Sequence, residues 1–361
     1  MNSSLDPLVL ELGARYVRCG ISGERAPRCV ERWEMAEMLQ TPSSAAKWRQ
    51  FLYLKLHAVC FDLLLVNPTR RRFVVCEDLL MPRVVRETLL SVLFDMLQVS
   101  SVTLVPSMLA VLHTTANHTA LVVDCGWSET RMLPVFKGIP LLHLYKSVPI
   151  GSQNCCDAIQ RGVTTFLSQS TEKSFDSNLP LAQVAVEDIL ERACFVQQMD
   201  GLLQNVVDAM FQYGDNNVLQ VSGSLRTGAV EQLVLGDEDR DGMSIVDGIV
   251  QTVKEAPLDV RAALLANMLF VGGTAMIPGL AQRLIAEVRK ALRFDNESTS
   301  AAVTIDQVQL VRTFFPRNML AWVGGSVYAA TDIARASAIS SDEYSSSKGT
   351  CVPDWLNVAK E

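Results

Sequence analysis

The sequence predicts an α/β protein of two lobes, each built from a sheet covered by helices. Its 361 residues exceed the roughly 250–300 residues that one hydrophobic core usually serves, which favours two lobes over one. Short apolar runs typical of strands alternate with amphipathic segments typical of helices along the chain. A strand that ends in an acid and is followed by a glycine occurs twice, at 8–13 and 121–126, and suggests an internal duplication. We therefore expect a first lobe of residues 1–120 and 320–361 and a second lobe of residues 121–319.

The composition excludes several classes of protein. Hydrophobic residues make up 49% of the chain, charged residues 20% and aromatic residues 7%, as in an ordinary soluble intracellular protein. No apolar run reaches the roughly 18–20 residues needed to span a bilayer, and residues 1–12 lack the pattern of a secretion signal. The nine cysteines include no Cys-x-x-Cys pair, which indicates reduced thiols rather than a zinc or redox site. A net charge of −7 argues against a nucleic-acid surface, and Arg70-Arg71-Arg72 is expected to be a solvated turn.

The first lobe opens with two short strands around a glycine-containing turn and continues with alternating strands and helices. Strands are expected at Leu8–Leu12, Tyr16–Ile21, Leu63–Val66, Phe73–Cys76 and Ser101–Val105. The helical spacing of apolar residues predicts a helix at Pro82–Leu97, where proline suits the first turn, and another helix follows at Ser107–His113. The polar segment Glu34–Lys47 is expected to form a short linker or helix.

The second lobe repeats the opening strand and turn and is richer in helices. Its expected strands are Leu121–Asp124, Met132–Phe136 and Met268–Val271. Its expected helices are Ala182–Phe211, Ser244–Lys254, Val260–Ala266 and Gly279–Leu292, with a Gly/Asp-rich loop at 236–242. Near the end of the chain, Gly324-Gly325 is interpreted as a turn that leads into a helix, and the serine-rich segment 340–348 as a mobile tail. Trp355 is expected to dock on the body of the protein.

Each of the two hairpins carries an acid and a glycine in an arrangement that suits the phosphates of a nucleotide. In the first hairpin they are Glu11 and Gly13, and in the second Asp124 and Gly126. A glycine lets backbone N–H groups approach phosphate oxygens because no Cβ intervenes, and a strand-end carboxylate can hold a Mg²⁺-bound water. Two such hairpins facing each other across a cleft would clamp one polyphosphate. Either hairpin taken alone is more often a plain turn.

A third candidate is the run Gly272-Gly273-Thr274-Ala275-Met276, which lies between an apolar strand and the helix that begins near Gly279. Tight glycines at a strand-to-helix junction let a planar adenine lie against the backbone, and the following helix N-terminus favours negative charge. Taken alone, this run is more often a compact turn between a strand and a helix.

The order and spacing of these elements resemble the actin family along almost the whole chain. The segments that carry the resemblance are 11–28, 123–126, 187–196, 259–261, 266–267, 272–279 and 322–326. The resemblance implies an actin-like fold of the actin/Hsp70/sugar-kinase type, with duplicated ribonuclease-H-like lobes around a cleft, and ATP as the family's ligand. The residues that would surround ATP are Glu11, Gly13, Arg15, Asp124, Gly126, Glu191, Gly272, Gly273, Thr274 and Met276. No catalytic residue and no metal ligand is expected.

Several residues depart from the family's pattern where ATP would be hydrolysed. Ala14 and Arg15 replace a hydroxyl residue and a glycine, and Trp127-Ser128 replace an acid and a glycine. The family's water-positioning glutamine falls at Pro106-Ser107, where neither side chain can replace it. Family lysines are replaced by Arg18, Leu190 and Asn318. We therefore expect a protein that is not an enzyme, and any bound ATP is expected to persist without hydrolysis.

The segment after the first hairpins is short. Only nineteen residues separate Arg28 from Trp48, where actin inserts a small subdomain whose loop grips the next subunit. The resemblance therefore implies a reduced subdomain 2. Without that loop the pointed-end face lacks a main tool for filament growth, whereas the opposite face can still bind the end of an existing filament. Such a molecule is suited to stop polymerisation.

Further stretches resemble one subfamily of actin-related proteins, numbered ten or eleven in different organisms, which caps the pointed end of dynactin's short actin-like filament. They are 64–68, 86–89, 92–94, 106–107, 123–126, 134–135, 138–140, 193–196, 223–226 and 352–355. The resemblance implies a non-catalytic dynactin subunit of the cytoplasm and cytoskeleton that supports dynein-driven cargo transport along microtubules. The implied partners are the actin-like filament subunit, the other pointed-end subunits and, indirectly, dynein, with no nucleic acid and no membrane.

Two other interpretations stay open. One is a nuclear actin-related subunit of a chromatin-remodelling complex, against which the short interval and Pro353-Asp354-Trp355 argue. The other is a divergent actin-fold ATPase or sugar kinase, which would need an acidic base and an intact phosphate grip. Arg15 and Trp127 oppose both requirements.

Overall fold

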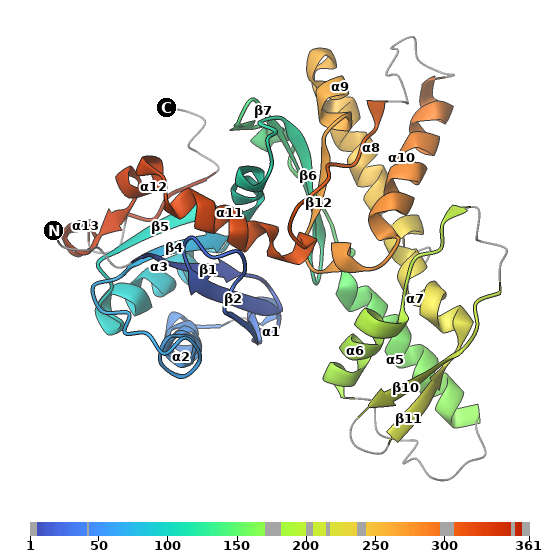
Figure 1. Cartoon of the computed structure of the whole chain (residues 1–361), viewed down its shortest axis with the longest axis horizontal. Coiled ribbons are helices and arrows are strands. Elements are labelled where there is room, and N and C mark those ends of the chain that lie inside the picture. Colours follow the sequence, from blue (N-terminus) through green and yellow to red (C-terminus); the bar gives the residue numbers. More distant parts are fainter. Residues whose placement is uncertain are drawn as a thin grey trace. The chain divides into compact units, whose positions relative to one another are not determined.

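The structure is a computed structural model, and it describes residues 6–41, 43–169, 182–199, 205–213, 217–236, 243–296, 307–347 and 351–355. The chain forms two compact units (Figure 1). Unit 1 consists of Met1–His118 and Thr313–Glu361, and unit 2 consists of Thr119–Arg312. The boundaries expected from the sequence, after residues 120 and 319, lie close to these divisions.

Unit 1 is built on a mixed sheet of six strands in the order β13-β5-β4-β1-β2-β3. The strands are β1 (Leu8–Leu12), β2 (Tyr16–Ile21), β3 (Cys29–Arg32), β4 (Arg72–Glu77), β5 (Ser101–Pro106) and β13 (Ile339–Ser340). Strand β4 pairs in parallel with both β1 and β5, whereas β1, β2 and β3 form an antiparallel meander. The meander places Glu11 directly opposite Arg18.

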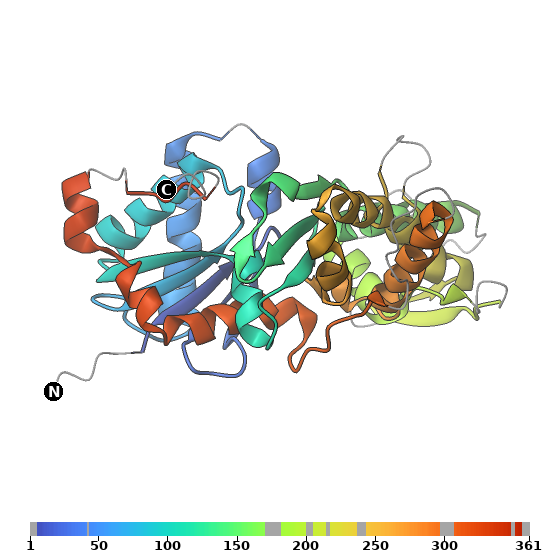
Figure 2. The ribbon, with the colours of Figure 1, turned by 90° about the horizontal axis from the view of Figure 1, so that it is seen from above.

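Helices cover both faces of this sheet. They are α1 (Met35–Gln40), α2 (Ala45–His57), α3 (Arg83–Ser91), α4 (Ser107–Ala110), α11 (Leu320–Ala329), α12 (Asp332–Ala336), α13 (Ser341–Ser347), the π-helices η1 (Ala58–Leu63) and η2 (Val92–Met96), and the 3₁₀ turns η3 (Val111–Thr114) and η9 (Arg317–Met319). Leu8 and Leu10 pack into a core shared with α2 and α3, while Val9 packs into a second core with α4 and α11. Successive strand side chains point to opposite faces, so α11 lies across the strands from α2 and α3 (Figure 2).

Unit 2 contains a five-stranded sheet and a separate hairpin. The sheet strands are β6 (Ala120–Cys125), β7 (Thr130–Phe136), β8 (Ile139–Pro140), β9 (Lys146–Val148) and β12 (Met268–Val271), and the hairpin strands are β10 (Ala209–Tyr213) and β11 (Asn217–Val221). The helices are α5 (Ser152–Gln169), α6 (Gln183–Ala193), α7 (Gly223–Leu235), α8 (Ile245–Glu255), α9 (Leu258–Leu265), α10 (Leu280–Asn296) and the 3₁₀ turns η4 (Leu142–Leu144) and η7 (Thr274–Met276). Their apolar faces form one large core with the sheet.

Most of the elements expected from the sequence are present. Strands β1 and β2 have the expected bounds, and the expected strands at Phe73–Cys76, Ser101–Val105 and Met268–Val271 are confirmed as β4, β5 and β12. The predicted helix at Pro82–Leu97 is confirmed as α3 and η2, with Pro82 capping its start. Of the loop expected at 236–242, only Gly236 lies within the described residues.

The expected strand at Leu63–Val66 is wrong, because this apolar run ends a helix. Helix η1 continues α2 as far as Leu63, and Leu65 then adopts a left-handed backbone with φ of 53°. A run of four apolar residues cannot by itself distinguish a buried strand from the end of a buried helix. Leu65 is also 79% exposed, so burial does not explain its presence here.

The same helix ending occurs twice in unit 1. Residues 61–66 and 94–99 share the pattern Phe-Asp-(Leu or Met)-Leu-x-Val. In the first copy the N–H of Leu64 donates to the carbonyl of Val59 at 2.9 Å, and in the second the N–H of Leu97 donates to the carbonyl of Val92 at 3.0 Å. In both copies residue x has φ of 53°. Residue x is Leu65 in the first copy and Gln98 in the second, so the turn itself does not require an apolar side chain.

The long helix expected at Ala182–Phe211 is also wrong. Helix α6 ends at Ala193, where Cys194 takes an extended backbone, and β10 follows from Ala209. The hairpin of β10 and β11 was missed. Phe211 and Leu219 face each other across it and are buried, which is the alternation of a half-buried sheet rather than of a helix.

The turn expected at Gly324-Gly325 is wrong. Gly324 and Gly325 lie inside α11 rather than in a turn before it. A Cβ on Gly324 would lie 1.9 Å from the carbonyl oxygen of Ala110, and one on Gly325 would lie 2.2 Å from the sulfur of Cys76. The two glycines therefore let α11 pack closely against α4 and the sheet.

The described part of the serine-rich segment expected to be mobile, residues 340–347, forms regular secondary structure. It contributes the short strand β13, which pairs with β5, and then α13. Tyr344 of α13 stacks on Phe94 with a ring distance of 4.6 Å, and this contact fastens the segment to the body.

The interval between Arg28 and Trp48 is as compact as its length predicts. Its described residues form β3, α1 and the beginning of α2, with no additional sheet among them. The expectation of a linker or short helix at Glu34–Lys47 is confirmed by α1. The interval that the resemblance predicts to be a reduced subdomain 2 thus holds one short strand, one short helix and the start of α2.

Candidate functional site

The first hairpin, between β1 and β2, turns on Gly13. Its N–H donates to the carbonyl of Tyr16 at 3.0 Å, and a Cβ at this position would lie 2.7 Å from the same oxygen. Only glycine fits so close an approach without displacement of the turn. The local geometry therefore requires the glycine that the sequence analysis singled out at position 13.

The segment that follows β3 is packed onto this turn. The indole N–H of Trp33 donates to the carbonyl of Gly13 at 2.7 Å, and the backbone N–H of Ala36 donates to the carbonyl of Ala14 at 2.9 Å. The backbone N–H of Trp33 also donates to the carbonyl of Arg15 at 3.2 Å. Because Trp33 is fully buried, the start of α1 is held firmly against the hairpin.

The charged residues of the hairpin form ion pairs within unit 1. A guanidinium nitrogen of Arg18 lies 2.9 Å from a carboxylate oxygen of Glu11, across the register of the two strands. A guanidinium nitrogen of Arg15 lies 2.6 Å from a carboxylate oxygen of Glu37 on α1. Each of the two arginines therefore has a carboxylate partner. Charge pairing leaves this hairpin a poor match for a polyphosphate with its metal ion, which would need unpaired cations and a carboxylate available to the metal's waters.

In unit 2 the expected residues lie together at one edge of the sheet. Strands β6 and β12 are parallel neighbours, with Asp124 beside Val271, so Gly126 and the 272–276 run follow adjacent strand ends. The hydroxyl of Thr274 donates to the carbonyl of Gly126 at 2.5 Å.

Gly272 makes this contact possible. It has φ of +93°, and a Cβ there would lie 2.3 Å from the carbonyl oxygen of Cys125 and 2.7 Å from a carboxylate oxygen of Asp124. A side chain would therefore push the two strand ends apart. Gly273 has open space around it, and Met276 is 46% exposed.

Glu191, the remaining residue of the expected set, is on the solvent-exposed part of α6. Partial burial, together with the negative charges of Glu187 and Asp188, raises the pKa of its carboxyl group. The chain after α6 reaches the turn beyond Met276, because the N–H of Val196 donates to the carbonyl of Pro278 at 2.9 Å.

The residues that depart from the family's pattern are well integrated into their units. Trp127 packs against the core of unit 2, and Leu190 is buried in that core. Pro106 ends β5 beside Glu77, and Ser107 begins α4.

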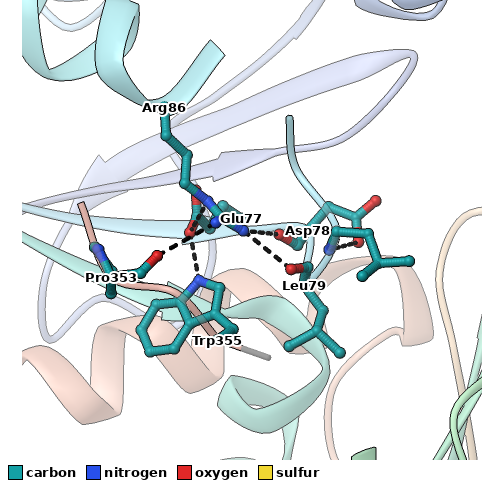
Figure 3. Close-up of polar contacts among 7 residues, drawn as sticks. Glu77, Asp78, Leu79, Arg86, Pro353 and Trp355 are labelled. Atoms are coloured by element: carbon teal, nitrogen blue, oxygen red, sulfur yellow. Dashed lines mark hydrogen bonds and ion pairs between the residues drawn. The ribbon is translucent and has the colours of Figure 1, made fainter. Parts of the chain in front are cut away.

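A buried polar cluster in unit 1 was not expected from the sequence (Figure 3). Glu77, at the end of β4, is fully buried and lies 2.8 Å from the guanidinium of Arg86 on α3. The indole N–H of Trp355 donates to the same carboxylate oxygen of Glu77 at 2.6 Å. The predicted docking of Trp355 is thus confirmed, and its partner is a buried ion pair.

The guanidinium of Arg86 connects α3 with the residues that follow β4 and with the C-terminal segment. It donates to the carbonyls of Leu79 at 3.0 Å, Asp78 at 3.3 Å and Pro353 at 3.4 Å (Figure 3). Burial raises the pKa of Glu77 to about 7, against the lowering effects of the Arg86 charge and of the Trp355 and Arg86 hydrogen bonds. The sequence signal for this cluster was the Pro353-Asp354-Trp355 run, although nothing in it identified Glu77 as the acceptor.

The described residues contain neither a metal-binding cluster of side chains nor a helix suited to span a membrane. No group of three or more His, Cys, Asp or Glu side chains there is arranged to hold a metal ion. Among the helices in that part of the chain, none combines the length and apolarity needed to cross a membrane.

A family model and a similar protein both indicate the same family. A family model described as Actin matches residues 46–221 and 205–353, which together span most of the chain. Actin-related protein 10 of Dictyostelium discoideum is 24% identical over 425 aligned residues, covering 98% of this chain and 89% of that protein. The matches extend across both units and include the hairpin of β6 and β7 and the 272–276 run. The chain therefore belongs to the actin family.

Proposed function

We propose that this protein is a non-catalytic structural subunit of dynactin that caps the pointed end of the actin-like filament and supports dynein-driven cargo transport. The observation that carries the proposal is the similarity to Actin-related protein 10 over nearly the whole chain, combined with the reduced segment between Arg28 and Trp48. The expected location is the cytoplasm, at the cytoskeleton.

The reduced segment supports capping because it affects one face only. A stable interface generally needs on the order of 1,000 Å² or more of complementary surface. The shortened interval removes part of that surface from the pointed-end face, while the opposite face keeps the actin-family elements. The expected partners are the last actin-like filament subunit on the barbed-end face and other pointed-end dynactin subunits on the opposite face.

The capping proposal predicts two outcomes. The purified protein should stay in the supernatant when it is sedimented under conditions that polymerise actin. Depletion of the protein from cells should change the length of dynactin filaments or remove the pointed-end subunits from the complex, as measured by electron microscopy and mass spectrometry. Filaments of the pure protein, or an unchanged dynactin after depletion, would contradict the proposal.

The proteins that copurify with the tagged chain separate this function from the alternatives. Dynactin subunits support the proposal. Chromatin-remodelling subunits instead would establish the nuclear alternative.

A further inference from the structure

We propose that the Glu37 carboxylate takes the place of a nucleotide phosphate as the anionic partner of Arg15. The charges of the first hairpin are then paired without nucleotide. This inference concerns the family's nucleotide site and does not depend on filament capping.

The first step is the position and burial of Arg15. It stands at the tip of the hairpin that resembles the first phosphate loop, where the family has a glycine. Its side chain is only 8% exposed, and a guanidinium that is largely removed from water needs an anionic partner. The Glu37 carboxylate supplies that partner at 2.6 Å.

The second step is the way Glu37 is held there. It lies on α1, and the chain leading into α1 is hydrogen-bonded to the hairpin through Trp33 and Ala36. Met35 and Ala36 are buried beside it. The backbone of Glu37 is therefore positioned by a packed element of the reduced interval.

The third step is charge. In the hairpin and α1, the positive charges of Arg15 and Arg18 are matched by Glu37 and Glu11. A phosphate placed on this hairpin would meet the Glu37 carboxylate and would have to displace it from Arg15. The Glu37 side chain is 53% exposed, so the anionic side of the pair faces solvent.

The test compares the wild-type chain with Glu37→Gln, using thermal unfolding of protein freed of nucleotide and metal by chelation. The wild-type Tm should be unchanged by Mg-ATP or by inorganic tripolyphosphate. Glu37→Gln should have a Tm several degrees lower, and millimolar tripolyphosphate should raise it again by supplying the negative charge that the neutral glutamine no longer gives Arg15.

Glu31→Gln is the matched control, because it removes an exposed acid from β3, only six residues away in sequence, and should behave like the wild type. A wild-type Tm that rises with Mg-ATP would overturn the proposal. So would a Glu37→Gln protein that keeps the wild-type Tm or does not respond to tripolyphosphate.

If Glu37→Gln does not fold, a charge reversal decides. The double variant Arg15→Glu with Glu37→Arg keeps the pair with its signs exchanged. It should unfold at a higher temperature than Glu37→Arg alone if the pair stabilises the hairpin. An equal or lower Tm for the double variant would overturn the proposal.

Discussion

At the scale of single residues, Leu65 combines a left-handed backbone with an exposed apolar side chain. A left-handed backbone costs an L-residue other than glycine roughly 1–2 kcal/mol, and Leu65 recovers little of this because it is 79% exposed. We predict that Leu65→Gly raises the free energy of unfolding by about 1 kcal/mol in urea titrations.

Leu54 provides the control for this prediction. It is also an exposed leucine, but it lies inside α2, where glycine is expected to cost roughly 0.5–1 kcal/mol. Opposite signs for Leu65→Gly and Leu54→Gly would establish that backbone strain is the cause. A loss of stability in both variants would show that Leu65 makes a contribution through its side chain.

At the scale of elements, the C-terminal segment is coupled to the end of β4 through Glu77. Because burial raises the pKa of Glu77 from 4.5 to about 7, the folded state holds a proton over this interval that the unfolded state has released. The contribution of Glu77 to the free energy of unfolding is thus fully present below pH 4.5 and is lost as pH rises through about 7. The steepest loss one carboxyl group can cause is about 1.4 kcal/mol per pH unit.

We predict that Glu77→Gln flattens this part of the pH dependence, measured by urea unfolding at several pH values between roughly 5 and 8, the interval around the Glu77 pKa of about 7. Above about pH 7, where the wild-type carboxyl group is ionised and pairs with Arg86, the variant should be less stable by about 3–5 kcal/mol, because Arg86 is left buried without its carboxylate. Trp355→Phe keeps the ring and removes the hydrogen bond that lowers the pKa of Glu77, so its stability should keep falling to higher pH than the wild type. Identical pH profiles for all three proteins would rule out Glu77 as the titrating group.

At the scale of the whole molecule, the replacements in the actin-like hairpins bear on ATP hydrolysis. The resemblance to actin puts the family's water-positioning glutamine at Pro106-Ser107, where neither side chain can replace it, and such groups typically contribute roughly 10²–10⁴-fold to a rate. We predict that the purified protein shows no ATP turnover above background in a phosphate-release assay. Turnover near one per second, a rate within the usual range of enzymes, would contradict a non-catalytic role.

The central strands of the main sheet in each unit could be predicted from the sequence. Strands β1, β2, β4 and β6 are short apolar runs bounded by turn residues, so their type is written in neighbouring positions. The failures were segments where the local pattern is ambiguous. The apolar run at 63–66 fits a buried strand and the end of a buried helix equally well. The pair Gly324-Gly325 looks like a turn unless the close approach of α4 and β4 is known.

The sequence by itself determined the α/β class, the two acid-and-glycine hairpins and the short interval after Arg28, because each of these is a pattern of neighbouring residues or of chain length. Only the tertiary structure decided which charges meet. Arg15 pairs with a residue 22 positions away, and the indole of Trp355 reaches an acceptor 278 positions away. Such pairs depend on how strands and helices pack, and burial then sets their energies, so no local pattern could have assigned them.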